Sequence, residues 1–323
     1  MMARSLQFPL HYQPDRLTGF ECATLDLPDD DEGKVVATLI RKKTARPSQK
    51  AVLYVHGFVD YFFQSELATQ FNQHGYDFYA LDLRKYGRSL LPHQTAYAVK
   101  DLRDYDPEIQ QALDIIWREG HQSLILAGHS TGGLICTSFA ARHSKHPLIK
   151  ALWLNSPFFD FNLKSSWQRL LLSHLVKWTK FLPRLPIPSG LNPLYVPSLH
   201  QDFHGEWDFD LKLKPKTYSF VPLSFIHAVY QVQQQLQQGI SLHLPTLIMH
   251  SQHSSSPKTW SKSAQNSDII LNVADIARCA KCIQGDVTTL AIESAVHDVV
   301  LSELDVRTQV YQQLFQWLQH KSL

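Results

Sequence analysis

Residues 123–133 read SLILAGHSTGG, and this stretch decides the fold of the 323-residue chain. An apolar run leads into Gly-His-Ser-Thr-Gly at 128–132, and small and apolar residues, LICTSFAAR, follow. The order predicts a strand, a tight turn and a helix, with Ser130 at the turn. Glycines on both sides of the serine let strand and helix approach closely. We expect the Ser130 hydroxyl above the free N–H groups of the helix's first turn, which favour negative charge.

Other segments of the chain repeat the alternation of strand and helix. Apolar runs rich in β-branched residues predict strands at 35–40, 51–55, 76–82, 123–128, 150–155, 245–250 and 287–292. Helical patterns lie between them, near 62–74, 108–119, 131–143, 272–283 and 303–319. Such alternation predicts an α/β protein with a mostly parallel central sheet and helices on both faces. Strands covered on both faces are expected to be almost entirely apolar, as these are.

The segment 158–242 interrupts this alternation. It is rich in Trp, Leu, Phe and Pro, and it contains the helical pattern YQVQQQLQQ. So many large apolar residues would be poorly placed in a surface loop. We therefore predict a core domain made of 1–157 and 243–323, with 158–242 inserted as a mainly helical cap.

The composition excludes several classes of protein. Hydrophobic residues make up 44% of the chain and charged residues 19%, which argues against disorder. A net charge of +2 gives no reason to expect a nucleic acid partner. Four cysteines do not form a disulfide scaffold, and the single C-x-x-C at 279–282 lacks the second pair of a zinc site. We predict no metal and no organic cofactor, and the sequence gives no oligomeric state.

The sequence predicts neither a secretory signal at its N-terminus nor a membrane-spanning segment elsewhere. The opening residues, MMARSLQFPLHYQPD, contain no apolar run long enough for a secretory signal. The most apolar internal stretch, LLLSHLVKWTKFL at 170–182, carries a histidine and two lysines. We therefore expect a cytoplasmic protein without stable membrane insertion.

Three motifs occur in an order that resembles the α/β-hydrolase superfamily. They are LYVHGF at 53–58, GHSTGG at 128–133 and AVHD at 295–298. The chain resembles the monoacylglycerol-lipase and lysophospholipase-like members of that superfamily, and also its serine aminopeptidases of the S33 type. The resemblance covers most of the chain outside 158–242. It implies the α/β-hydrolase fold and a Ser-His-Asp triad that transfers an acyl group.

The resemblance assigns roles to four residues. Ser130 matches the nucleophile, and His297, in the loop after the last predicted strand, matches the general base. The residue after His-Gly in the first motif, Phe58, and the residue after the nucleophile, Thr131, match the two backbone donors of an oxyanion hole. Each is expected to donate its N–H to the negative charge that develops on a substrate carbonyl oxygen.

The acid of the predicted triad departs from the family pattern. The family places it a few residues after the strand that ends here in HSQHSSS at 250–256, and that stretch has no carboxylate. Asp268 comes next, 29 residues before His297, which resembles the usual interval. If Asp268 is the acid, this chain has an insertion relative to the family pattern, roughly residues 254–267, between the strand and the acid. Two alternatives stay open: Asp275, in the first turn of the following helix, and Asp160, after an earlier strand.

Several neighbouring residues are predicted to line a substrate pocket: His56, Asp60, Tyr61, His129, Phe158 and Phe159. Aromatic residues in or near the insertion predict an apolar surface beside the site. Each of them could instead pack the insertion against the core. They are Trp153, Phe158, Phe159, Trp167, Trp178 and Trp207. We therefore predict a small ester or lipid-like substrate with a hydrophobic acyl chain.

Two other functions stay open. A serine aminopeptidase or amidase needs acidic groups for the substrate amine, and Asp202, Glu206, Asp208 and Asp210 could supply them. A non-catalytic ligand-binding protein could also keep this fold, because fold alone does not establish activity.

Overall fold

The computed structural model describes residues 10–163, 165–217 and 220–323. The segment 1–9, which opens the stretch predicted to lack a secretory signal, lies outside the described residues. Among the described residues, no helix combines the length and the apolar character needed to cross a bilayer.

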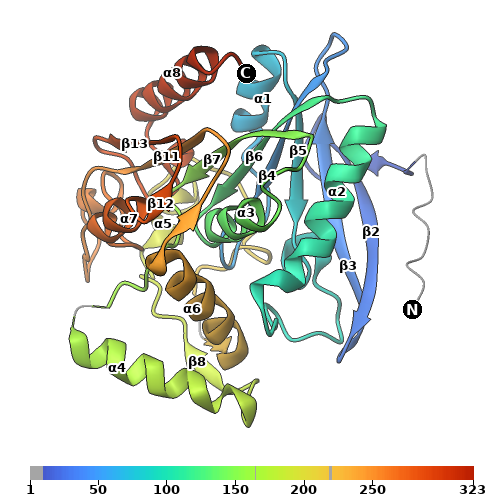
Figure 1. Cartoon of the computed structure of the whole chain (residues 1–323). Coiled ribbons are helices and arrows are strands. Elements are labelled where there is room, and N and C mark those ends of the chain that lie inside the picture. The colour runs from blue at the N-terminus through green and yellow to red at the C-terminus, as the bar shows by residue number, and fades with distance from the viewer. Residues whose placement is uncertain (1–9, 164, 218–219) are drawn as a thin grey trace.

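A central sheet organises the molecule (Figure 1). In the part of the chain described, nine strands form it in the order β1 (Gln13–Pro14), β2 (Glu21–Asp30), β3 (Gly33–Lys42), β5 (Asp77–Asp82), β4 (Lys50–Val55), β6 (Ser123–His129), β7 (Ile149–Asn155), β11 (Thr246–Ser251) and β13 (Val287–Ile292). Neighbours are antiparallel from β1 to β5 and parallel from β5 to β13. This confirms the predicted α/β class with a mostly parallel sheet.

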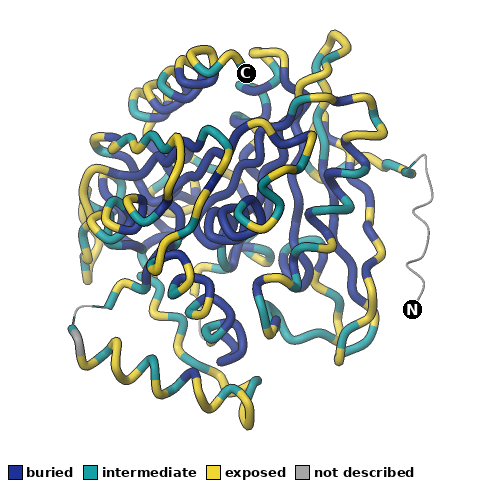
Figure 2. Tube along the Cα trace, in the orientation of Figure 1, coloured by how far each residue is buried: buried dark blue, intermediate teal, exposed yellow. Residues whose placement is uncertain are grey.

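Helices cover both faces of the sheet. They are α1 (Ser65–Gln73), α2 (Asp106–Arg118), α3 (Thr131–Arg142), α7 (Val273–Ala280) and α8 (Leu304–His320), with short 3-10 turns η1 (Gly87–Ser89), η2 (Leu102–Tyr105), η4 (Lys262–Ala264) and η5 (Val299–Leu301). Successive strand residues alternate between two apolar clusters, as their pleat requires. Leu53 of β4 packs in the cluster that includes α2 and α3, while Tyr54 packs in the cluster that includes α1 and α8. Figure 2 shows the strands buried between these layers.

One predicted helix ends earlier than expected, and one long strand was missed. The helix expected over 272–283 ends earlier, because α7 stops at Ala280 and the chain then forms the short strand β12 (Ile283–Gln284). Cys282 therefore lies beyond the helix. The strand β2 was not predicted, because it alternates buried and exposed residues instead of forming an apolar run.

The segment 158–242 contains mostly helices. Its elements are α4 (Ser166–Leu175), η3 (Val176–Lys180), β8 (Pro186–Pro188), α5 (Tyr195–Leu199), β9 (Phe220–Pro222), α6 (Leu223–Gln238) and β10 (Ile240–Ser241). The helix α6 buries Phe225, Val229 and Leu236 in the cluster beneath α3. By contrast, α4 stands away from the sheet and is exposed along much of its length (Figures 1 and 2).

A buried ion pair ties α2 to the loop after β5. The guanidinium of Arg84 makes three hydrogen bonds with the Glu108 carboxylate, the shortest 2.6 Å from Nη2 to Oε2. Both side chains are shielded from solvent. A buried charge that loses its partner keeps the full cost of desolvation, whereas an exposed pair contributes little.

Glu108→Gln is expected to lower the free energy of unfolding by about 3 kcal/mol, because it leaves the Arg84 charge buried without a counter-charge. Asp26→Asn is the matched control, since Asp26 pairs with Lys34 in an exposed position, and it should cost less than about 1 kcal/mol. Urea denaturation followed by circular dichroism measures both. Equal losses in the two variants would contradict the assignment of a buried, stabilising pair.

Candidate active site

Ser130 sits in a strained turn between β6 and α3. Its backbone angles are φ 52° and ψ −116°, a left-handed conformation that is unfavourable for a residue with a side chain. A Cβ on Gly132 would lie 2.3 Å from the carbonyl oxygen of His56, and one on Gly128 would lie 2.5 Å from that of Gly132. Both contacts are impossible, so only glycine fits at these positions. The turn is thereby pressed against the end of β4.

The structure brings Ser130, His297 and Asp268 into one hydrogen-bonded chain. Ser130 Oγ lies 3.0 Å from His297 Nε2, and His297 Nδ1 lies 2.8 Å from Asp268 Oδ2. All three residues are buried. A carboxylate accepts from Nδ1–H, so Nε2 is left as the acceptor of the serine proton.

Asp268 reaches this position after an excursion of the chain. After β11, the chain leaves the end of the strand near Ser254 and comes back to it at Asp268. There the Asp268 N–H donates to the His253 carbonyl at 2.9 Å. The second carboxylate oxygen of Asp268, Oδ1, accepts the N–H groups of Ile270 and Leu271 at 2.8 and 2.7 Å. These bonds fix the carboxylate with Oδ2 facing the imidazole. The excursion covers the residues between Ser254 and Asp268; that they are an insertion relative to the family stays a prediction.

The two alternative acids have other partners. Asp275 accepts from Asn272, the N-cap of α7, and pairs with Arg278. Asp160 pairs with Arg169 and also with Arg278. Neither carboxylate contacts His297.

The loop that carries His297 is anchored by a buried network that sequence reasoning missed. Asp298 accepts from Asn155 Nδ2 at 2.6 Å and from Gln64 Nε2 at 3.1 Å. Asn155 Oδ1 in turn accepts the N–H of Val299 at 3.1 Å. Asp298 therefore points away from Ser130 and holds the loop in place. These partners are more than 140 residues apart along the chain, so no local sequence signal reveals them.

Two backbone N–H groups next to Ser130 have no hydrogen-bond acceptor within the described part of the chain. They belong to Phe58, in the loop after β4, and Thr131, the first residue of α3. The loop lies directly on the turn, since a Cβ on Gly57 would be 3.2 Å from Ser130 Cβ. Backbone N–H groups without an acceptor in a loop and at a helix N-terminus are of the kind that bind anions.

A small cavity of about 30 Å³ opens at Ser130. Its lining consists of Phe58, Asp60, His129, Ser130, Leu191, Tyr195, Lys214, Ile270 and His297. The polar members and Tyr195 are buried, whereas Phe58, Leu191 and Ile270 are partly exposed. The cavity therefore has a polar floor and an apolar rim. Its volume corresponds to about one water molecule.

Only some of the predicted pocket residues line this cavity. Asp60 and His129 do, whereas His56, Tyr61, Phe158 and Phe159 do not. The His56 ring instead accepts the N–H of Leu83 at 3.1 Å, which is a structural role. Tyr61 accepts the N–H of Asp210 through its hydroxyl. Phe158 and Phe159 pack in the apolar cluster beneath α3.

The tryptophans predicted to form an apolar surface by the site do not line the Ser130 cavity. Trp167 and Trp178 lie on α4 and η3 with exposed fractions of 65% and 58%. Trp153 is buried in the sheet, and Trp207 donates its indole N–H to the Leu301 carbonyl. Lys214, Tyr195, Leu191 and Ile270 were not expected in the site.

His129 is unsuited to act as the base. Its Nδ1 donates to the carbonyl of Asn155 at 3.1 Å. Burial lowers the pKa of His129 to about 4, despite the nearby Asp298 carboxylate. The ring is therefore neutral near pH 7, and its role is to pack beside His297, with ring centres 4.8 Å apart.

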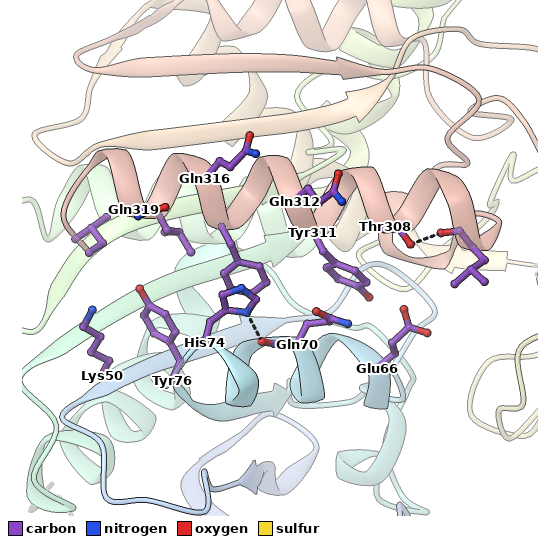
Figure 3. A pocket seen from close by; sticks show the side chains of 14 residues that line it. Lys50, Glu66, Gln70, His74, Tyr76, Thr308, Tyr311, Gln312, Gln316 and Gln319 are labelled. Carbon is purple, nitrogen blue, oxygen red and sulfur yellow. Dashed lines mark hydrogen bonds between the residues drawn. The ribbon is translucent and has the colours of Figure 1, made fainter.

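A second, larger groove in the described part of the chain does not contain Ser130, His297 or Asp268. This groove of about 750 Å³ lies between α1 and α8. Figure 3 shows it with Glu66, Gln70 and His74 on the α1 side and Tyr311 and Gln312 on the α8 side. None of its lining residues belongs to the Ser130 cavity. Within the described ranges, no group of three or more His, Cys, Asp or Glu side chains is arranged to hold a metal ion.

Comparison with known proteins places the chain in a family. The family model described as serine aminopeptidase, S33 matches residues 46–258, which is more than half of the chain. Epoxide hydrolase 3 of Xenopus tropicalis is 31% identical over 142 residues. That match spans 42% of this chain and 35% of the relative, so the chain spans about a third of the length of that curated protein.

Solved structures share the fold at low sequence identity. A soluble variant of monoglyceride lipase from Saccharomyces cerevisiae superposes with a TM-score of 0.65 at 19% identity, covering 97% of this chain and 95% of the lipase. Monoacylglycerol lipase of Paleococcus ferrophilus gives a TM-score of 0.61 at 17% identity, covering 88% and 99%. With the sheet order and the family match, these findings show that the chain belongs to the serine aminopeptidase S33 family of α/β-hydrolases.

Proposed function

We propose that this hydrolase is a serine esterase that cleaves carboxylic esters with hydrophobic acyl chains through an acyl-enzyme. The observation that carries the proposal is the buried chain from Ser130 Oγ through His297 to Asp268, with links of 3.0 and 2.8 Å. Such a chain activates a hydroxyl that is otherwise a weak nucleophile. The lipase relatives share the fold and are consistent with this chemistry.

Each group then has one role in the reaction. His297 Nε2 takes the proton from Ser130 as Oγ bonds to the ester carbonyl carbon, and the carbonyl oxygen becomes an oxyanion. The N–H groups of Phe58 and Thr131 stabilise that oxygen. Asp268 holds the imidazole tautomer and stabilises its protonated form. His297 then gives the proton to the departing alcohol as the ester C–O bond breaks. Water attacks the acyl carbon while His297 takes its proton, and His297 passes that proton to Ser130 Oγ as the bond from Oγ to the acyl group breaks and the acid leaves.

The cavity favours an apolar acyl group. Phe58, Leu191 and Ile270 form its partly exposed rim. The acyl chain of an ester whose carbonyl lies at Ser130 would therefore contact apolar side chains where it leaves the cavity. The free space of about 30 Å³ is far below the several hundred Å³ that ligand pockets usually provide. The acyl chain of such a substrate therefore extends beyond this cavity, over its rim.

An aminopeptidase is the second candidate, favoured by one buried carboxylate in the cavity, that of Asp60. The cluster predicted to bind a substrate amine does not line the cavity. Glu206 pairs with Arg307, and Asp210 pairs with Arg16. Asp60 itself is already neutralised by Lys214. These pairings favour an uncharged ester over a cationic amine.

A fluorophosphonate probe tests the nucleophile. The wild-type protein should be labelled, because the probe captures a serine activated by a neighbouring base, and Ser130→Ala should abolish the labelling. Ser173→Ala, on α4 and outside the cavity, is the control and should label as the wild type does. In-gel fluorescence reads the result. A wild type that stays unlabelled would favour a non-catalytic ligand-binding protein.

Asp268→Asn should lower kcat for p-nitrophenyl esters by roughly 10⁴-fold, because the amide favours the wrong imidazole tautomer and no longer stabilises the imidazolium. Asp275→Asn, seven residues along, removes a carboxylate that contacts Asn272 and Arg278 instead, so its kcat should stay within about twofold of wild type. Steady-state kinetics compares the two. The reverse pattern would move the acid to Asp275.

Substrate class is tested by comparing p-nitrophenyl esters of graded chain length with aminoacyl p-nitroanilides. We expect kcat/KM to rise with acyl length and to exceed that for the anilides by at least about 10²-fold, because the rim is apolar and the Asp60 charge is paired. Faster turnover of the anilides would favour the aminopeptidase.

A further inference from the structure

The loop that carries the Phe58 N–H, residues 57–61, is held by the inserted segment at three points. The Phe58 ring stacks on Phe225 of α6, with centres 4.9 Å apart and planes at 21°. The Asp60 carboxylate receives the Lys214 ammonium, with Oδ1 and Nζ 2.8 Å apart. The Tyr61 hydroxyl accepts the N–H of Asp210 at 2.7 Å. Two of these three contacts come from the short stretch 210–214.

The contact between Lys214 and Asp60 is fully buried. Each side chain has an exposed fraction of only 2%. The ammonium also lies 5.3 to 5.9 Å from the ring centres of Phe63, Tyr195 and Phe209. Aromatic faces attract a cation, but they do not replace its hydration completely. Burying two opposite charges beside a nucleophile often costs more than burying apolar groups of the same size, so stability alone does not explain the pair.

The loop needs an external constraint because its backbone is strained. Val59, between Phe58 and Asp60, has φ 48°. This left-handed conformation is a genuine outlier for a β-branched residue. Strain of this kind persists only where surrounding contacts hold the backbone. Asp60 provides such contacts. Its Oδ1 atom forms the ion pair with Lys214 and also accepts the N–H of Tyr61 at 2.9 Å.

We propose that Lys214 is a positioning residue for the oxyanion hole, acting through Asp60 to aim the N–H of Phe58 at the oxygen that becomes charged. The inference rests on the proposed function, since it concerns an oxyanion at Ser130. It gives the segment 158–242 a part in catalysis: the segment supplies Lys214 and thereby fixes a core loop in its working geometry. A donor that is misaimed by even a fraction of an ångström loses much of its effect on the transition state.

The double variant Asp60→Asn/Lys214→Met tests the proposal. Both replacements are neutral and similar in size to the original side chains, and no charge is left buried alone. The Met side chain also suits the aromatic surroundings of Lys214. We expect kcat for p-nitrophenyl esters to fall about 10²-fold while KM stays within about twofold, because the lost interaction exists only in the transition state. Lys212→Met, two residues away and exposed, is the control and should behave as wild type.

An alkyl trifluoromethyl ketone separates positioning from a simple loss of stability. This inhibitor forms a hemiketal oxyanion with the serine, so its Ki should rise by the same factor by which kcat/KM falls. A variant that merely contained less folded protein would show a lower kcat with an unchanged Ki. Wild-type kcat and Ki in the double variant would overturn the inference. So would a raised KM with an unchanged kcat, which would make Lys214 a substrate contact.

The result is distinguishable from a failure of the proposed function. If Ser130→Ala abolishes turnover while the double variant keeps wild-type kcat, only the inference about Lys214 fails. If Ser130→Ala retains turnover, both fail, because no oxyanion forms at Ser130.

Discussion

The active site depends on a contact between two turns that leaves no room for side chains. The turn at Ser130 meets the loop after β4 so closely that a Cβ at Gly132 would overlap the His56 carbonyl. The same closeness brings Gly57 against Ser130, so the Phe58 loop and the Thr131 turn, whose N–H groups have no acceptor in the described chain, lie side by side. The positive φ of Ser130 is the local cost of this arrangement. A residue larger than glycine at position 132 would push the Ser130 turn away from this loop and so disrupt the site without changing Ser130 itself.

The parallel sheet explains why residues so far apart in sequence meet. The carboxyl ends of β4, β6, β11 and β13 lie at one edge, and these strands belong to one continuous run of parallel neighbours. Phe58 follows β4, Ser130 follows β6, and Asp268 and His297 follow β11 and β13. Each strand therefore delivers one chemical group to the same edge. The buried Asp298 network then fixes the last of these loops against β7.

Residues that lie in a local sequence motif could be predicted as members of the site. Residues that reach the site only through contacts between distant parts of the chain could not. Ser130 lies in a motif with a fixed geometry, and Asp268 was inferred from its spacing to His297. The strand β2 lacked an apolar run because exposed residues interrupt its buried ones. Lys214 could not be found because its partner, Asp60, lies more than 150 residues away and nothing in LKLKPK marks a buried lysine. The pocket aromatics were misplaced because composition shows that a segment is apolar but not which side faces the site.

The groups of the proposed mechanism are held by two sets of contacts. Ser130, His297 and Asp268 are fixed by the sheet edge and by backbone bonds within 253–271, and the segment 158–242 adds the Tyr195 ring against His297 and the Phe158 N–H on the Ser130 carbonyl. The loop with the Phe58 N–H is held instead by α6 and by the stretch 210–214. The Asp60–Lys214 ion pair and the Tyr61–Asp210 hydrogen bond are the polar part of that hold, and both reach the loop from 210–214. Under the proposed mechanism, the segment 158–242 therefore acts on charge stabilisation through the Phe58 loop, in addition to its packing against His297.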